Sequence, residues 1–321
     1  MCGCRQPAGA TYTWSPWVNV ASLFYVTNAA SDGAGSFRDA ITRANAVCLQ
    51  RQQPCEIDFQ ISGEINLDTP LPAITAGKIA IDGKKQITLD GSGMQSPGVT
   101  INGEEITLSG FKIVNWGGAG ILIVAPPRTS LRAAISDNEI RQNLRGVMAL
   151  VAVSPQAKWT EVRGNSMKGN GQLGIDFALD LVTPNVDDDS TRPVPNAPVI
   201  TSATYDSGKT VIIGHVDLRK PADVGFFLPI IDLYGSTSFD AQGEKPLTVY
   251  VDYGSGVGIN SRTGDFVFTY NGDVRGQYIT GTYTRMYLGK GVTANALQPR
   301  PQYYENWQAT SEMSNPVRVA P

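Results

Sequence analysis

Short runs of alternating apolar and polar residues recur at a fixed interval through the middle of the chain. The runs are residues 79–83, 106–110, 133–137 and 160–164. Each has a central aliphatic residue, and successive ones lie 27 residues apart: Ile81, Leu108, Ile135 and Val162. No unit contains a ten-residue helical pattern, so each is predicted to be short strands joined by tight turns. A repeat of this length is typical of a stacked solenoid.

We interpret each unit as one coil of a parallel β-helix. Neighbouring coils would stack about 4.8 Å apart, with the aliphatic residues forming an inward ladder. Asn138 and Asn165 occupy equivalent turn positions, where side-chain amides can bond along the stacking axis. A leucine-rich repeat is the competing interpretation. It needs a longer Leu/Asn consensus and usually a helix in each unit, and this segment has neither.

A helix is predicted over residues 36–47. Ser36 and Asp39 form the start of a capping box, with Asp in the place where Glu or Gln is usual. One helical stripe then carries the apolar residues Phe37, Ile41, Ala44 and Val47. An open first coil would expose unpaired backbone groups, so we expect this helix to cap it. The coils are expected to begin at residues 57–67, after an N-terminal extension over 1–24.

The repeat stops after Phe177, where the chain becomes rich in Pro and Asp over residues 180–198. Such a composition is typical of a linker, and we place a domain boundary near residue 190. Residues 25–190 are thus assigned to the β-helix and 191–321 to a second domain. About seven short strands with frequent turns predict an immunoglobulin-like β-sandwich there. It contains no Cys, so no disulfide joins its sheets.

Composition supports an all-β protein and excludes two classes of partner. The 321 residues include 34 Gly, and only 17% are charged. The net charge is −3 and no block of Lys or Arg occurs, which argues against nucleic-acid binding. No apolar run approaches the ~18 residues of a membrane span. The chain as given also has no signal peptide, although cleavage or omission of one leaves secretion open.

Three segments resemble a known family. Residues 25–45 resemble the opening of bacterial right-handed parallel β-helix surface proteins, which read roughly VTN…DSGxGSLRxAIxxAN. Residues 170–187 resemble their exit segment, GLGIDLxxDGVTPND, and residues 309–319 the closing strand TSEFSNxVxV of the following module. The resemblance implies a right-handed parallel β-helix followed by an Ig-like module, in an extracellular or cell-surface setting. It implies no particular reaction.

The four cysteines suggest an oxidising compartment. Cys48 and Cys55 enclose a short loop and are predicted to form a disulfide. A bond between Cys2 and Cys4 would be strained, so those two residues are free, pair elsewhere or bond another chain. The only histidine, His215, lies on an alternating strand pattern and is interpreted as a surface residue or one with its hydrogen bonds satisfied.

The equipment of pectate lyases, polygalacturonases and epimerases is absent from the coils. A glycosidase needs only two carboxyl groups about 5–10 Å apart, however, and several acids could form such a pair across coils. The weak candidates are Asp82, Asp90, Asp137, Glu139 and Glu161. The simpler interpretation, which we favour, is that they are exposed turn and strand residues.

Two further clusters are candidate sites. Five carboxylates gather near the predicted boundary: Asp176, Asp180, Asp187, Asp188 and Asp189. They would suit a structural calcium ion, although we favour the simpler interpretation of a solvated acidic linker. No other cofactor is expected. The aromatic residues Tyr303, Tyr304 and Trp307 in a late insertion are candidates for ligand binding, although aromatic residues more often pack.

These observations favour a non-catalytic extracellular structural or adhesive protein. A rigid β-helix would serve as a scaffold for surface attachment, assembly or glycan binding. Its partner would be a cell-surface glycan or protein, or another copy of the chain. The first alternative is a polysaccharide-active enzyme, a lyase or glycoside hydrolase, with acids along a groove. The second is a phage or appendage filament subunit.

Overall fold

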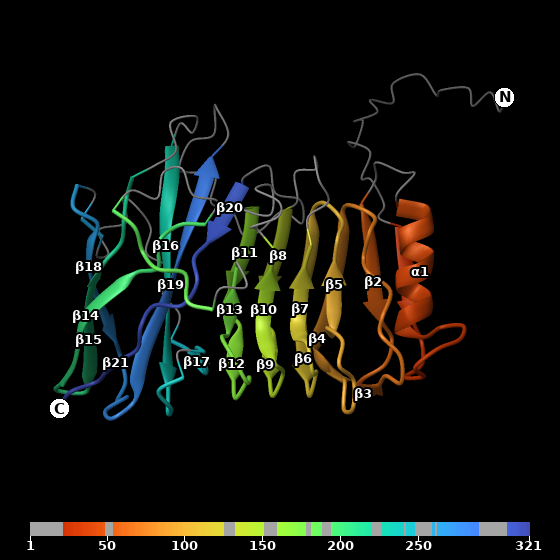
Figure 1. Ribbon diagram of the computed structural model, residues 1–321, viewed down its shortest axis with the longest axis horizontal. Coiled ribbons are helices and arrows are strands. Elements are labelled where there is room, and N and C mark those ends of the chain that lie inside the picture. The colour runs from red at the N-terminus through yellow and green to blue at the C-terminus, as the bar shows by residue number, and fades with distance from the viewer. Residues whose placement is uncertain are drawn as a thin grey trace, which may run out of the picture.

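The computed structural model describes residues 22–48, 54–124, 132–150, 159–177, 181–187, 194–219, 226–240, 242–247, 259–260, 262–288 and 307–321. Its architecture is a parallel β-solenoid followed by antiparallel sheets. Figure 1 shows the solenoid strands stacked side by side, with helix α1 at one end and the antiparallel sheets at the other.

Two parallel sheets form the solenoid. The larger has nine strands: β1 (Ser22–Val26), β2 (Cys55–Phe59), β3 (Gly63–Asn66), β4 (Ile79–Asp90), β6 (Ile106–Val114), β8 (Arg132–Ser136), β9 (Glu139–Arg141), β11 (Trp159–Arg163) and β12 (Ser166–Lys168). The smaller has four: β5 (Val99–Ile101), β7 (Ala119–Ile123), β10 (Arg145–Ala149) and β13 (Ile175–Asp176). Long strands β4 and β6 turn a corner, so each pairs with two shorter strands.

The 27-residue ladder is confirmed. Ile81 pairs with Leu108, Leu108 with Ile135, and Ile135 with Val162, each in parallel register. All four side chains are buried, which contributes about 1.5–3 kcal/mol apiece to stability. The same row continues backwards through Ile57. Alternation along each strand therefore fills the interior of the solenoid with aliphatic side chains.

The solenoid begins earlier than the sequence predicts. Strand β1 pairs in parallel with β2, and Phe24 lies beside Ile57 in the inward row. The first sheet strand thus precedes the helix, and the expectation that the coils begin at residues 57–67 is wrong. Leu23 and Tyr25 are outward and exposed. Those two exposed apolar residues blur the alternation that would have indicated a strand.

Helix α1 (Phe37–Cys48) lies beside β1 and β2 (Figure 1). Ser36 begins it as predicted, because its Oγ accepts a hydrogen bond from the Asp39 N–H at 3.1 Å. Its apolar face buries Phe37, Ile41 and Ala44 in the solenoid core. The Phe37 ring lies 5.1 Å from that of Phe59, centroid to centroid.

The antiparallel part contains two sheets. One has β14 (Val199–Asp206), β15 (Lys209–His215) and β18 (Asp265–Tyr270). The other has β16 (Phe226–Ser236), β17 (Lys245–Pro246), β19 (Tyr278–Leu288), β20 (Trp307–Thr310) and β21 (Val317–Arg318). Residues from both sheets, including Ile212, Phe266 and Tyr283, form a second apolar core. Tyr234 and Met313, by contrast, belong to the solenoid core, so the two parts share a packed junction.

Two columns of asparagine amides run along the stacking axis. In the predicted column, Asn138 Nδ2–H donates to Asn165 Oδ1 at 3.0 Å. A second column, which the sequence analysis missed, joins Asn143 Nδ2–H to Asn170 Oδ1 at 3.2 Å. All four side chains are buried, and each amide also donates to a carbonyl on a preceding coil. These bonds fix successive coils in register.

Candidate functional site

A polar groove of about 390 Å³ crosses one outer face of the solenoid. One wall is a row of outward side chains in parallel register: Thr88, Lys112, Glu139 and Ser166. Because adjacent strands lie about 4.8 Å apart, this row extends about 14 Å along the axis. Pro246 of strand β17 also lines the groove, so the antiparallel part contributes to it.

The groove follows a corner where the backbone turns sharply. Gly110, Asp137 and Gly164 line it with φ values of +72°, +58° and +64°. Such left-handed turns favour Gly, and Asn or Asp tolerate them. The repeat is broken at Lys84 and Lys85, which also have positive φ, where the register shifts between β4 and β6. This insertion places Lys85 in the groove.

The structure brings together some of the predicted acids. Asp137 and Glu139 line the groove, while Asp82 lies beside it and accepts a hydrogen bond from the Lys84 N–H at 2.8 Å. Glu139 forms an ion pair with Arg141 at 3.0 Å. Since Lys85 and Lys112 line the same groove, charges of both signs face a ligand there.

Asp90 lies outside the groove, and its bonds favour the ionised form. Its carboxylate accepts hydrogen bonds from Ser92 and Asn115. Partial burial pushes the pKa of Asp90 upward, but these hydrogen bonds outweigh burial and hold the pKa below its usual value. A general acid for glycoside cleavage needs the opposite shift, so Asp90 does not suit that role.

Glu161 is buried at the junction with the antiparallel sheets. It lies 3.7 Å from Arg163, whose guanidinium also forms two hydrogen bonds to Asp232 at 2.6 and 2.9 Å. Burial disfavours the charge of Arg163, but Asp232 and then Glu161 more than offset it, so the pKa of Arg163 is raised. Glu161 is therefore part of a structural ion network that joins β11 to β16.

Two of the predicted calcium ligands, Asp176 and Asp187, lie in the described residues, and they occupy different sites. Asp176 is buried and pairs with Arg145 at 2.9 Å, whereas Asp187 lines a different cleft beside His215. Asp180, Asp188 and Asp189 lie outside the described residues. Within the described residues, His, Cys, Asp and Glu side chains form no group of three or more that could hold a metal ion.

The remaining predicted residues have different outcomes. The Cys48–Cys55 disulfide is present and joins the end of α1 to the start of β2. Trp307 is the first residue of β20, where its backbone pairs with Tyr287. Tyr303 and Tyr304 lie outside the described residues, so the predicted aromatic binding site stays a prediction.

Sequence reasoning missed the residues that join the last coil to the antiparallel part. Gln242 Oε1 accepts hydrogen bonds from the Asn170 N–H at 2.8 Å and from Asn170 Nδ2–H at 3.0 Å. Asn170 Oδ1 accepts in the same way from Asn143, at 3.1 and 3.2 Å. Gln242 thus occupies the place of the next asparagine in the column. A residue 72 positions away gives no periodic signal in the sequence.

Glu312 makes a second connection across this junction. Its carboxylate accepts hydrogen bonds from the Phe177 N–H at 3.0 Å and the Thr183 N–H at 2.8 Å. Burial raises the pKa of Glu312, and the nearby Asp176 charge adds to the increase, although these hydrogen bonds oppose it. The carboxylate holds the exit segment of the solenoid against the closing residues of the chain.

The class of this protein is defined by its fold, a parallel β-solenoid, because comparison with known proteins adds no family. No protein-family model matches the chain, and no curated protein matches it. The one helix in the described part of the chain is too short and too polar to span a bilayer.

Proposed function

We propose that this protein is a non-catalytic extracellular scaffold whose solenoid groove binds a surface glycan or protein. The observation that carries the proposal is the in-register row of Thr88, Lys112, Glu139 and Ser166. A row of hydrogen-bonding groups at regular spacing suits an extended partner with its own repeating unit. The asparagine columns hold the backbone beneath this row fixed, which lowers the entropic cost of binding.

Several finer assignments belong to the same proposal. Helix α1 serves as the N-terminal cap of a right-handed β-helix, and the antiparallel sheets form an Ig-like sandwich. The Cys48–Cys55 disulfide supports an oxidising, extracellular location. The structural calcium ion near the exit segment stays a prediction, because Asp180, Asp188 and Asp189 lie outside the described residues.

The test measures binding to soluble polysaccharides by calorimetry. The polysaccharides are polygalacturonate, alginate, hyaluronate and dextran. We expect one of them to bind without release of reducing ends or unsaturated products. The Lys112→Ala and Glu139→Ala variants should weaken that binding at least tenfold. Lys209→Ala, an exposed change on β15 away from the groove, is the matched control. Equal binding by all variants, or no binding by the intact protein, contradicts the groove assignment.

One observation favours the enzyme alternative, a lyase or glycoside hydrolase. Asp137 and Glu139 line the same groove, on either side of a buried asparagine. Product release that is lost in both Asp137→Asn and Glu139→Gln would establish this alternative and overturn the non-catalytic proposal. Product release that persists in both variants would indicate a contaminating activity.

End-to-end assembly into a filament has less support than a discrete scaffold. Gln242, Thr310 and Glu312 already bond the last described coil, so a second copy would have to displace them. Light scattering should show a species of fixed mass as concentration rises. Growth of mass without limit would favour the filament.

A further inference from the structure

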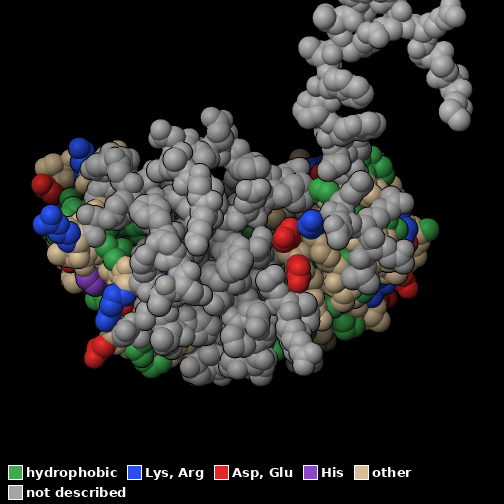
Figure 2. Space-filling model, turned by 90° about the horizontal axis from the view of Figure 1, so that it is seen from above, with side chains coloured by type: hydrophobic (Ala, Val, Ile, Leu, Met, Phe, Trp, Pro, Cys, Tyr) green, Lys and Arg blue, Asp and Glu red, His purple; other side chains and the backbone are tan. Residues whose placement is uncertain are grey.

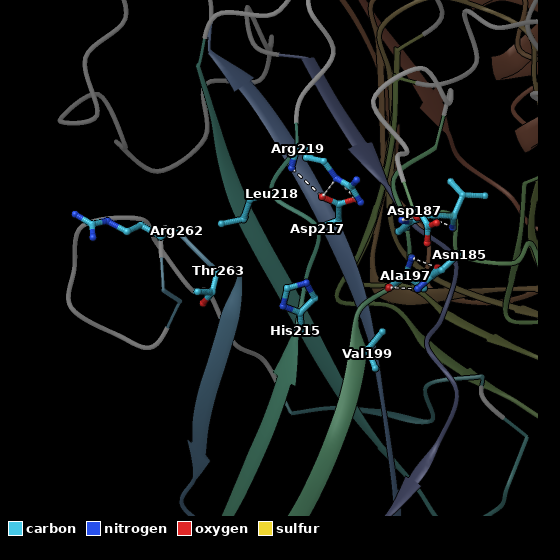
Figure 3. A pocket seen from close by; sticks show the side chains of 12 residues that line it. Asn185, Asp187, Ala197, Val199, His215, Asp217, Leu218, Arg219, Arg262 and Thr263 are labelled. Atoms are coloured by element: carbon cyan, nitrogen blue, oxygen red, sulfur yellow. Dashed lines mark hydrogen bonds and ion pairs between the residues drawn. The ribbon is translucent and has the colours of Figure 1, made fainter.

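A second cleft, of about 640 Å³, opens in the antiparallel part, away from the solenoid groove. Figure 3 shows His215 at the end of β15, with Thr263 on one side and Asp187 and Asn185 on the other. The volume falls within the ~300–1,000 Å³ of small-molecule sites. The walls come from four segments: the exit of the solenoid, the chain leading into β14, the end of β15 with the residues after it, and the turn before β18.

The walls of the cleft are fixed by hydrogen bonds. Asn185 and Ala197 exchange two, at 2.8 and 2.9 Å, and Asn196 and Val186 exchange two more, at 2.7 and 3.1 Å. These reciprocal bonds clamp the exit segment to the chain that leads into β14. A wall held in this way loses little conformational freedom when a ligand binds.

His215 is oriented by a carboxylate. Its Nδ1 lies 3.1 Å from Asp265 Oδ1, and Thr263 Oγ donates to Asp265 Oδ2 at 2.6 Å. Nδ1–H therefore donates to Asp265, which leaves Nε2 as a hydrogen-bond acceptor. Nε2 has no bonding partner among the described residues, and nearly half of the side chain is exposed.

The charges in the cleft do not favour an anion. Asp217 and Arg219 neutralise each other through a bond of 2.6 Å, and Figure 3 shows Arg262 extending outward, away from His215. Asp187 has no hydrogen-bond donor or cation bonded to it in the described part of the chain. Figure 2 shows both basic and acidic side chains on the face that carries the single histidine. A phosphate or sulfate would meet an uncompensated carboxylate.

The polar groups left open suit a ligand with several hydroxyl groups. Asp187 and His215 Nε2 both accept hydrogen bonds, so a ligand that donates from two of its hydroxyls can satisfy both. Val199 and Val186 offer exposed apolar surface next to these groups. The described lining contains no Phe, Tyr or Trp on which a nucleobase could stack.

We propose that this cleft binds a neutral sugar ring, whose hydroxyls bond to Asp187 and His215 while its C–H face contacts Val199. None of the residues of this cleft lines the solenoid groove. The sugar-binding proposal can therefore be tested independently of the function proposed for that groove. Together the two sites would let one chain contact a glycan at two separate places.

His215 makes the test direct, because the chain has only one histidine. Its imidazole Cε1–H resonance is identified without assignment in the full-length protein. Methyl pyranosides of glucose, galactose and mannose are titrated against this resonance at constant pH. We expect a saturable shift with at least one of them. No saturable shift with any of the three, or a saturable shift with inorganic phosphate alone, overturns the proposal.

A matched pair of variants locates the contact. Asp187→Asn removes the open carboxylate and should weaken sugar binding about tenfold. Asp206→Asn makes the same chemical change at the far end of the β14–β15 hairpin and should leave binding unchanged. Equal affinity in both variants contradicts the role of Asp187. Their thermal unfolding, measured in parallel, shows that each remains folded.

Discussion

The two ends of the solenoid make different kinds of contact with the structures beside them. At the helix end, α1 contributes an apolar face, with Phe37, Ile41 and Ala44 fully buried. At the sheet end, Gln242 and Glu312 bond directly to the last coil. A helix uses its backbone groups internally, so it can pack an apolar face against the core but cannot extend the hydrogen bonding of a sheet. The antiparallel part contributes both apolar contacts and hydrogen bonds, because its loops and polar side chains are not used in the backbone bonding of its own sheets.

Long side chains partly compensate for this limit at the helix end. Asn45 of α1 donates to Ala73 O at 2.7 Å and accepts from the Thr75 N–H at 2.9 Å. Arg38 donates to the carbonyl oxygens of Thr69 and Pro70, both at 2.7 Å. These bonds attach the helix to the chain between β3 and β4. The comparison teaches that the helix end depends mainly on packing and the sheet end mainly on polar bonds.

The largest expected effect is at the helix end. Phe37→Ala removes a fully buried ring that contacts Phe59 and lies near Phe111. The free energy of unfolding should fall by about 3–5 kcal/mol, because the cavity cannot collapse between α1 and the strands. Urea denaturation measures this. A loss below 1 kcal/mol would show that packing does not dominate this end.

A slightly smaller effect is expected at the sheet end. Asp232→Asn keeps the shape of the side chain but leaves Arg163 buried without its main counter-charge. We expect a loss of about 3 kcal/mol in the free energy of unfolding, since breaking a buried pair leaves an uncompensated charge. Asp273→Asn, at an exposed pair with Arg275, is the control and should cost less than 1 kcal/mol. Similar losses in the two variants would contradict the importance of burial.

Gln242 allows a sharper test of the polar bonds. Gln242→Ala should cost about 2 kcal/mol, because the buried Asn170 amide groups lose their acceptor. Gln242→Glu restores that acceptor but not the two donor bonds from Nε2 to the carbonyl oxygens of Asn170 and Gln172. If the glutamate variant matches the wild-type stability at pH 7, hydrogen bonding to those carbonyls is unimportant. Thermal and urea unfolding distinguish these outcomes.

The smallest effect is a pH dependence of opposite sign at two glutamates of the sheet end. The raised pKa of Glu312 means that folding favours its protonated form. Its contribution to stability is therefore present in acid and is lost as pH rises above the usual value of 4.5. Glu244 is also penalised by burial, but its bonds to Lys168 and Thr237 prevail, so its pKa is lowered. Its contribution is lost as pH falls below 4.5.

The measurement compares Glu312→Gln and Glu244→Gln with the wild-type protein from about one pH unit below the usual glutamate pKa of 4.5 up to neutral pH. The stability lost in Glu312→Gln should shrink as pH rises, while that lost in Glu244→Gln should grow. Parallel slopes for the two variants would show that the two carboxyl groups share one environment.

Local periodicity accounts for what the sequence predicted well. Ile81 and Leu108 occupy the same place in successive units, so their stacking follows from the 27-residue interval alone. Helix α1 spans residues 37–48, one residue from the predicted 36–47, because Ser36 and the apolar stripe define it locally. The Cys48–Cys55 bond was likewise accessible because the two residues enclose a short loop.

Contacts between distant segments could not be predicted in the same way. Gln242 and Asp232 lie outside the repeat, and nothing in their neighbourhood marks them as partners of Asn170 and Arg163. The groove was predicted only in part. Asp137 and Glu139 are among the candidate residues that the sequence indicates, but Lys112 is not. A single lysine on a strand carries no signal of what its side chain faces. Which outward residues share a face depends on the corner at Gly110 and its equivalents.

Because Gln242 continues the asparagine column, the number of coils in the solenoid can change during evolution. Gln242 bonds to the last described coil, through Asn170 and Gln172, and Asn143 presents the same amide one coil earlier. An added or removed unit of 27 residues would therefore leave both boundary contacts intact. Such a change would lengthen or shorten the solenoid by about 4.8 Å.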